Sequence, residues 1–137
     1  MTEKRAFVDT SCWVGQLSKN DQLHDSAVAF YQSLFSQNYS FTTTSAVINE
    51  TANALSVPKF CHSVVAFHKR LLASSRIEIV FVDERLWMAG WKLYEERADK
   101  AWSLTDCISI VVMQEKGLVE ALARDEHFRQ AGFKTLL

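Results

Sequence analysis

The stretch AWSLTDCISIVVMQEKGLVEALARDEHF, residues 101–128, decides the fold of this chain. Its middle is apolar nearly all round, which predicts a buried helix that ends in a turn at Gly117. The next apolar run, residues 118–123, predicts a buried strand. Asp106 lies at the start of the helix and Asp125 at the exit of the strand. A buried carboxylate is costly unless it is paired, hydrogen-bonded or bound to a metal, so these two acids need an explanation.

The composition is that of one globular protein. The chain has 137 residues, of which 48% are hydrophobic, and its four glycines and single proline leave no flexible linker. We therefore expect one domain, residues 1–137, with a sizeable core. The net charge of −1 argues against an architectural nucleic-acid binder. It does not exclude a nuclease, because carboxylates that bind a metal themselves lower the net charge.

The cysteines and the N-terminus indicate a cytoplasmic protein. Cys12, Cys61 and Cys107 are odd in number, lie in apolar sequence and form no CxxC pair, so we expect buried, reduced thiols. The apolar run near the N-terminus is too short for a signal peptide, and no run approaches the length of a membrane span. We expect no membrane association.

Short strand-like runs alternate with helical patterns along the whole chain. This alternation predicts an α/β protein with three layers, α/β/α, around a mainly parallel central sheet. The third strand is continuously apolar except for Glu78, so we expect it to be buried on both faces. The predicted strands are 6–8, 39–42, 77–82, 118–123 and, as a final edge strand, 134–137; helices are predicted over 12–17, 21–35, 45–55, 60–73, after Asp83, and from Ser103.

Acids follow the strands where such sheets bind ligands, beyond the carboxyl ends. Asp9 follows the first strand and Asp125 the fourth, although each also suits a helix N-cap. Asp106 has a capping alternative too, because Ser103 and Asp106 resemble the two ends of a capping box. The helix that follows is apolar all round, however, so we expect Asp106 to face a cavity or cleft.

Glu50 lies on or beside the apolar stripe of its helix. Its neighbours at helical spacing are Ala46, Val47 and Ala54, and a solvated glutamate is not expected there. A glutamate at the boundary of the stripe that reaches out to water is the alternative.

A convergence of these acids would explain all of them at once. Carboxylates that meet beyond a parallel sheet make an oxygen-only site, which suits Mg²⁺ or Mn²⁺. The histidines and cysteines show no zinc-ligand spacing, and the sequence has no glycine-rich phosphate loop. The chemistry that the residues favour is metal-assisted reaction at a phosphate.

Four short motifs resemble one family. FVDTS at 7–11, INE at 48–50, WSLTDC at 102–107 and ALARDEHF at 121–128 are similar to the motifs of the PIN domain, in particular of the bacterial VapC-type toxins. The motifs span nearly the whole chain and follow the family's order. Each motif is weak alone, and the set of four is fairly specific.

The resemblance implies a compact α/β/α PIN-like fold and a ribonuclease that depends on Mg²⁺ or Mn²⁺ and leaves a 5′-phosphate and a 3′-hydroxyl. Asp9, Glu50, Asp106 and Asp125 match the family's acids, as metal ligands and catalytic residues, and Ser11 matches a supporting hydroxyl. Ser103 would support the site by fixing the start of the helix that carries Asp106. The implied partners are an RNA substrate, a cognate antitoxin protein and a second copy of the chain in a homodimer.

Other functions fit less well. A phosphatase of the haloacid dehalogenase type needs a second acid two residues after the first, where this chain has Ser11, and a phosphate-receiving regulatory domain needs paired acids near its first strand. The remaining alternative is a PIN-fold module that binds protein or RNA with little or no nuclease activity.

Several further residues have two interpretations. Asp99 could lie near the site without being a ligand. The basic residues between Lys59 and Arg76 are typical of a solvated helix face, and phosphate contact is the minority interpretation. Lys100, Arg124 and Arg129 are candidates to contact RNA phosphates, with ordinary surface charge as the alternative. The aromatic residues Trp87, Trp91, Phe30 and Tyr31 could belong to the core or to an interface.

Overall fold

The computed structural model describes residues 3–124 and 126–137 of the chain. Strands and helices alternate along it, as the sequence predicts. In chain order the elements are β1 (Arg5–Val8), α1 (Thr10–Leu17), α2 (His24–Ser36), β2 (Ser40–Thr44), α3 (Ser45–Ala54), a 3₁₀ turn (Pro58–Phe60), α4 (Cys61–Ala73), β3 (Ile77–Val80), α5 (Glu84–Glu96), α6 (Leu104–Lys116), β4 (Glu120–Leu122), α7 (His127–Gln130) and β5 (Lys134–Thr135).

The strands described here form one parallel sheet in the order β3-β2-β1-β4-β5. The chain moves outward from β1 through β2 to β3, and then returns to place β4 on the other side of β1. The order therefore reverses between β1 and β4, where Val8 is in register with Leu122. In open α/β sheets such a switch point is where ligands bind. The predicted α/β class with a parallel sheet is confirmed.

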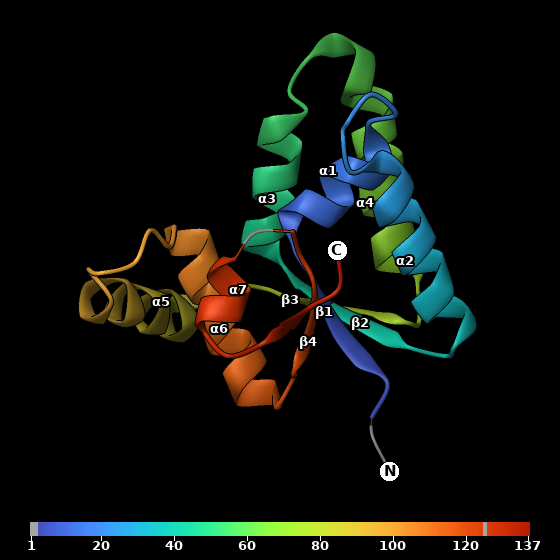
Figure 1. The fold of residues 1–137 in the computed structure, drawn as a ribbon. Helices are drawn as coiled ribbons and strands as arrows, with labels where there is room; N and C mark the ends of the chain where they lie inside the picture. The colour runs from blue at the N-terminus through green and yellow to red at the C-terminus, as the bar shows by residue number, and fades with distance from the viewer. Residues whose placement is uncertain (1–2, 125) are drawn as a thin grey trace.

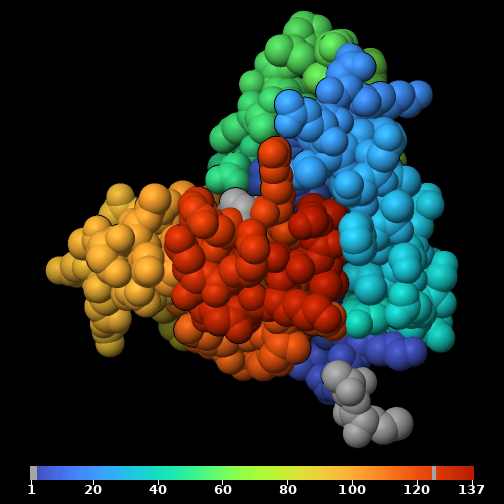
Figure 2. Space-filling model, in the orientation of Figure 1, coloured from blue at the N-terminus to red at the C-terminus, as the bar shows by residue number. Residues whose placement is uncertain are grey.

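Helices cover both faces of this sheet (Figure 1). One side carries α1, α2 and α4, and the other carries α5, α6 and α7. Helix α3 begins directly after β2 and contacts both α1 and α6, so it lies between the two helical layers. In Figure 2 the region of α5, coloured yellow to orange, projects as a lobe from the side of the molecule. No helix of the described residues is long and apolar enough to cross a membrane.

Helix α6 forms the centre of one layer because its sequence is apolar on nearly every side. Its buried residues run from Asp106 to Met113 and are interrupted only by the half-buried Val111. Gly117 ends the helix in the left-handed conformation, with a φ of 67°, which glycine adopts without strain. Gly90 lets α5 approach closely, since a Cβ there would lie 2.5 Å from Ile108 Cγ1. The predicted buried helix and its glycine turn are confirmed.

Three expectations about burial are wrong. β3 lies at the edge of the sheet, so its residues are half-buried or exposed instead of buried on both faces. The strand predicted over 118–123 is shorter, Glu120–Leu122, and the Val119 side chain is exposed, although Leu118 and Ala123 are buried as expected. Cys61 is exposed at the start of α4, whereas Cys12 and Cys107 are buried as expected. In each case the local sequence is apolar, and the place of the residue in the fold decides its exposure.

The ambiguous aromatic residues are not core residues, apart from Tyr31. Trp87, Trp91 and Phe30 are exposed. Tyr31 is half-buried and stacks on Phe41, with the two ring centroids 4.4 Å apart. The basic residues of α4 are exposed, as expected of a solvated face.

Arg76, at the end of the same basic stretch, has a structural role. Its guanidinium donates to the backbone carbonyl of Phe35 at 2.7 Å and, through Nε, to that of Tyr39 at 2.8 Å.

Candidate functional site

A hollow of about 390 Å³ opens at the carboxyl end of β1. Five elements or segments contribute to it: the start of α1, α3, the segment before α6, α6 and α7. Three of the predicted acids, Asp9, Glu50 and Asp106, line it together. The complete lining is Asp9, Thr10, Ser11, Val14, Glu50, Ala101, Ser103, Asp106 and His127.

Asp9 is fixed at the switch point of the sheet by its backbone. Its N–H donates to the carbonyl of Leu122 at 3.1 Å, and its own carbonyl accepts from the N–H of Cys12 at 3.1 Å. The residue occupies the N-cap position of α1, but its side chain makes no capping hydrogen bond. The side chain is only 4% exposed and lines the hollow. Capping therefore does not explain why an aspartate stands here.

Asp106 is 7% exposed and does cap its helix. Its Oδ2 accepts from the Ser103 N–H at 3.0 Å, and the Ser103 hydroxyl accepts from the Asp106 N–H at 3.0 Å, which completes the predicted capping box. His127 Nδ1 also lies 2.9 Å from Oδ2. These contacts fix the orientation of the carboxylate, and the same side chain still lines the hollow. Asp106 thus has both of the roles that the sequence left open.

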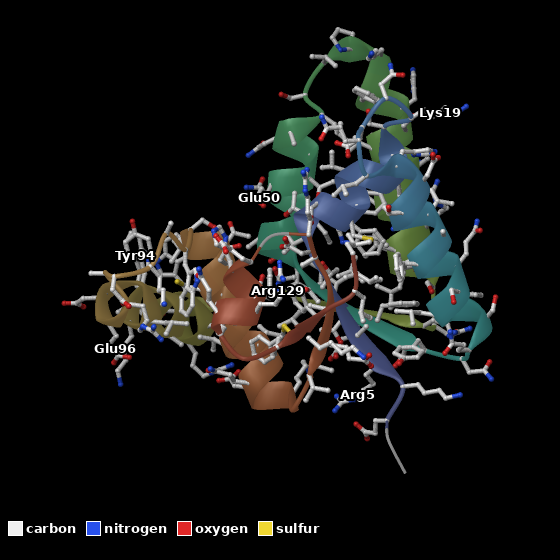
Figure 3. All side chains as sticks on the ribbon, viewed as in Figure 1. Arg5, Lys19, Glu50, Tyr94, Glu96 and Arg129 are labelled. Carbon is white, nitrogen blue, oxygen red and sulfur yellow. The ribbon has the colours of Figure 1, made fainter. Side chains whose placement is uncertain are left out.

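Glu50 and Ser11 are the remaining predicted site residues within the part of the chain that the structure describes. Glu50 is half-buried on α3 and lines the hollow (Figure 3), so it is not a fully solvated glutamate. The Ser11 hydroxyl accepts from the Arg124 N–H at 3.2 Å. That bond ties the first turn of α1 to the segment that follows β4.

The fourth predicted acid, Asp125, lies outside the described residues, so its place in the site stays a prediction. Within residues 3–124 and 126–137, no group of three or more His, Cys, Asp or Glu side chains is arranged so that it could hold a metal ion. The donor chemistry fits a hard divalent cation, since Asp9, Asp106 and Glu50 all offer carboxylate oxygens. The described acids are thus an incomplete donor set of the right type.

His127 is a site residue that the sequence reasoning missed. Its spacing from the other histidines and the cysteines does not suit a zinc ligand. Its position two residues after Asp125, at the start of α7, was the available signal, because a residue there faces the same end of the sheet. Asp99, by contrast, does not line the hollow. It is exposed and pairs with Arg97 at 3.2 Å, and the hydrogen bond from that guanidinium lowers the pKa of Asp99.

Two buried thiols lie next to the acids in sequence. The pKa of Cys12 is raised to about 12, chiefly by burial; a hydrogen bond from Gln16 opposes this rise and the nearby charge of Asp9 adds to it. Burial and then the charge of Asp106 raise the pKa of Cys107 to about 11. A cysteine nucleophile needs a lowered pKa, so both thiols are protonated structural groups at neutral pH.

Comparisons with known proteins identify the family of the chain. The family model of the PIN domain matches residues 6–134. The chain is 28% identical over 131 residues to the 23S rRNA-specific endonuclease VapC20 of Mycobacterium tuberculosis, an alignment that covers 93% of this chain and 94% of that protein.

Two solved structures share the fold. The crystal structure of M. tuberculosis VapC20, described as a sarcin–ricin loop cleaving toxin, superposes with a TM-score of 0.81 at 27% identity and covers 93% of this chain and 95% of that one. The FitAcB structure from Neisseria gonorrhoeae has a TM-score of 0.64 at 16% identity, with 96% of both chains covered, and supports the fold alone.

Proposed function

The chain belongs to the PIN domain family, and from this membership we propose that it is a ribonuclease that depends on Mg²⁺ or Mn²⁺. The observation that carries the proposal is the pair of buried aspartates, Asp9 and Asp106, which line one hollow at the switch point of the sheet. Two buried carboxylates that face the same space repel each other, and a divalent cation between them would offset that cost.

We assign the cation to Asp9, Asp106 and Asp125, with Glu50 as a ligand directly or through a water molecule. Asp125 would supply the donor that the described acids lack. A bound cation would make an attacking water more acidic and offset the negative charge of the phosphate.

The chain's own residues would orient this site. Ser103 and His127 hold the Asp106 carboxylate, and Ser11 holds α1 against the segment after β4. Water attacks the phosphorus in line with the leaving 3′-oxygen. The products are then a 5′-phosphate and a 3′-hydroxyl.

The substrate and partners follow from the relatives. VapC20 is described as cleaving the sarcin–ricin loop of 23S rRNA, so a structured loop of ribosomal RNA is the first substrate to test. As a toxin-type enzyme the chain would pair with an antitoxin protein and form a homodimer. Exposed apolar side chains supply surface for such partners; among them are Phe35 and Phe30 on α2 and Leu72 on α4.

The test is cleavage of 23S rRNA and of mixed RNA by the purified protein in Mg²⁺, Mn²⁺ or EDTA. We expect cleavage with either metal and none in EDTA. Asp9→Asn and Asp106→Asn should each reduce the rate at least 100-fold while leaving the circular dichroism spectrum unchanged. Full activity of Asp106→Asn would contradict the assignment. RNA binding without cleavage at any metal concentration would favour the binding module instead.

Co-purification tests the toxin part of the proposal separately. A small protein encoded beside this chain should bind it and inhibit cleavage. Active protein that no such neighbour inhibits would leave the nuclease assignment intact and contradict the antitoxin pairing.

A further inference from the structure

A second hollow of about 810 Å³ lies beside the acid-lined one. The two share Ala101 and Ser103 in their walls, so they adjoin just before the start of α6. Its remaining walls come from the C-terminal half of α5 and from the segment between α5 and α6. The C-terminal half of α5 belongs to the lobe that projects from the molecule in Figure 2.

Aromatic rings form much of the wall of this second hollow. Trp91 and Tyr94 on α5 are 42% and 45% exposed, and their ring centroids lie 5.4 Å apart in an edge-to-face arrangement. Tyr94 is labelled in Figure 3. Trp102 is 5% exposed and held in place, since its Nε1 donates to Gln130 Oε1 at 3.0 Å. A rigid ring beside two exposed ones offers flat apolar surface in a concave site.

Two cations accompany the rings. Arg97 and Lys100 both line the hollow, and the Arg97 guanidinium carbon lies 5.0 Å from the centroid of the Trp102 ring. Asp99 pairs with both cations, closely with Arg97 at 3.2 Å and loosely with Lys100 at 3.9 Å, but it does not line the hollow. Glu95 is the acid in the wall. Lys100 directly precedes Ala101, which lines both hollows. Of the two cations, it is therefore the one closer in sequence to the wall that the hollows share.

We propose that this second hollow binds the base of a nucleotide in single-stranded RNA, adjacent to the phosphate at the acid site. The proposal rests on the proposed function. Single-stranded bases are recognised by stacking on aromatic side chains, with cations along the backbone. Trp91 and Tyr94 supply the stacking faces, and Lys100 contacts the phosphate that enters the acid site. The hollow has the size of an ordinary ligand pocket.

A nucleotide fits this site better than a protein partner does. The site is concave, is lined by two cations and adjoins the acid hollow. The apolar surface of α5 that a helix could cover also extends to Met88, outside the hollow. Trp87 allows a bound nucleotide to be distinguished from a bound protein partner. It is exposed on the same helix, with its ring centroid 6.0 Å from that of Trp91, but it does not line the hollow.

The experiment measures binding without cleavage. The full-length protein is titrated into a fluorescein-labelled single-stranded RNA 12-mer of mixed sequence in EDTA, and fluorescence anisotropy gives the Kd. Trp91→Ala should raise the Kd about 5- to 100-fold, as expected for the loss of one base–aromatic stack. Trp91→Phe, which keeps a stacking face, should restore most of the affinity. Trp87→Ala should bind like the wild type.

The proposal would be overturned by no binding by the wild type, by no loss of affinity in Trp91→Ala, or by an equal loss in Trp87→Ala. Sedimentation of each variant shows whether an altered oligomer explains a loss of binding, which would also overturn it. The nuclease proposal is judged independently by cleavage in Mg²⁺. If the wild type binds RNA through Trp91 but does not cleave it, this inference stands and the proposed nuclease function is wrong.

Discussion

His127 Nδ1 lies 2.9 Å from Asp106 Oδ2, the same oxygen that accepts the Ser103 N–H at 3.0 Å. The start of α7 and the start of α6 thus meet on one atom of one carboxylate. The contact joins the segment after β4 to the helix that carries the second buried acid. Outer groups of this kind orient the ligands of metal sites.

His127→Ala should therefore weaken metal use without unfolding the protein. Loss of an orienting partner typically costs about 10- to 100-fold in metal affinity or activity. The measurement is the Mg²⁺ concentration at half-maximal cleavage, which should rise in this variant. His68→Ala, an exposed histidine on α4, is the control and should behave like the wild type. An unchanged Mg²⁺ dependence of His127→Ala would remove His127 from the site.

Ser103→Ala should impair both stability and cleavage, because the Ser103 hydroxyl accepts from the Asp106 N–H and so fixes the backbone of the first turn of α6, which carries the Asp106 side chain. Loss of an N-cap costs about 1 kcal/mol in the free energy of unfolding. Asp83→Ala is a matched control, since Asp83 caps α5 by accepting from the Leu86 N–H at 2.8 Å and does not line the hollow. Both variants should lose similar stability in urea unfolding. Only Ser103→Ala should lose cleavage, and equal rates in the two would contradict the aiming role.

Divalent cations should stabilise the folded protein. A ligand that binds only the folded state raises the free energy of unfolding by RT ln(1 + [L]/Kd), or about 2.7 kcal/mol at 100 times the Kd. Mg²⁺ should therefore raise the melting temperature of the wild type, and EDTA should reverse the increase. Asp9→Asn should be indifferent to Mg²⁺. A Mg²⁺-dependent increase of equal size in that variant would locate the bound cation elsewhere.

The buried thiol of Cys12 should make the protein less stable in alkali. Its pKa is raised from 9.0 to about 12 in the fold, so between these pH values the unfolded chain loses a proton that the folded chain keeps. The free energy of unfolding then falls as pH rises, by at most about 1.4 kcal/mol per pH unit for this group. Below pH 9 the thiol keeps its proton in both states, so its contribution to the free energy of unfolding does not change with pH.

Urea unfolding at pH 8, 9, 10 and 11 measures this slope. Cys12→Ala should flatten it, whereas Cys61→Ala should not, because Cys61 is exposed. Burial and then the charge of Cys12 raise the pKa of Tyr31 to about 12 as well, so part of the flattening in Cys12→Ala comes from Tyr31, and the comparison measures this buried pair. Identical slopes would show that Cys12 does not titrate differently in the two states.

Apart from the short helix α7, the order of strands and helices could be predicted because these elements have local signals. The capping residues Thr44, Asp83 and Ser103 are used as such, and Gly117 turns where a glycine is needed. Burial was predicted less well. The apolar runs that contain Val119 and Cys61 look like core in sequence, but exposure depends on which neighbours cover them.

The sequence by itself determined that acids follow the strands of a parallel α/β sheet, since composition and periodicity act over a few residues at a time. Only the tertiary structure decided that β4 lies beside β1, which brings Asp9, Glu50 and Asp106 to one hollow and His127 onto Asp106. It also decided that the rings of α5 open beside the acids. Those relationships join residues far apart in the chain, so no local pattern encodes them.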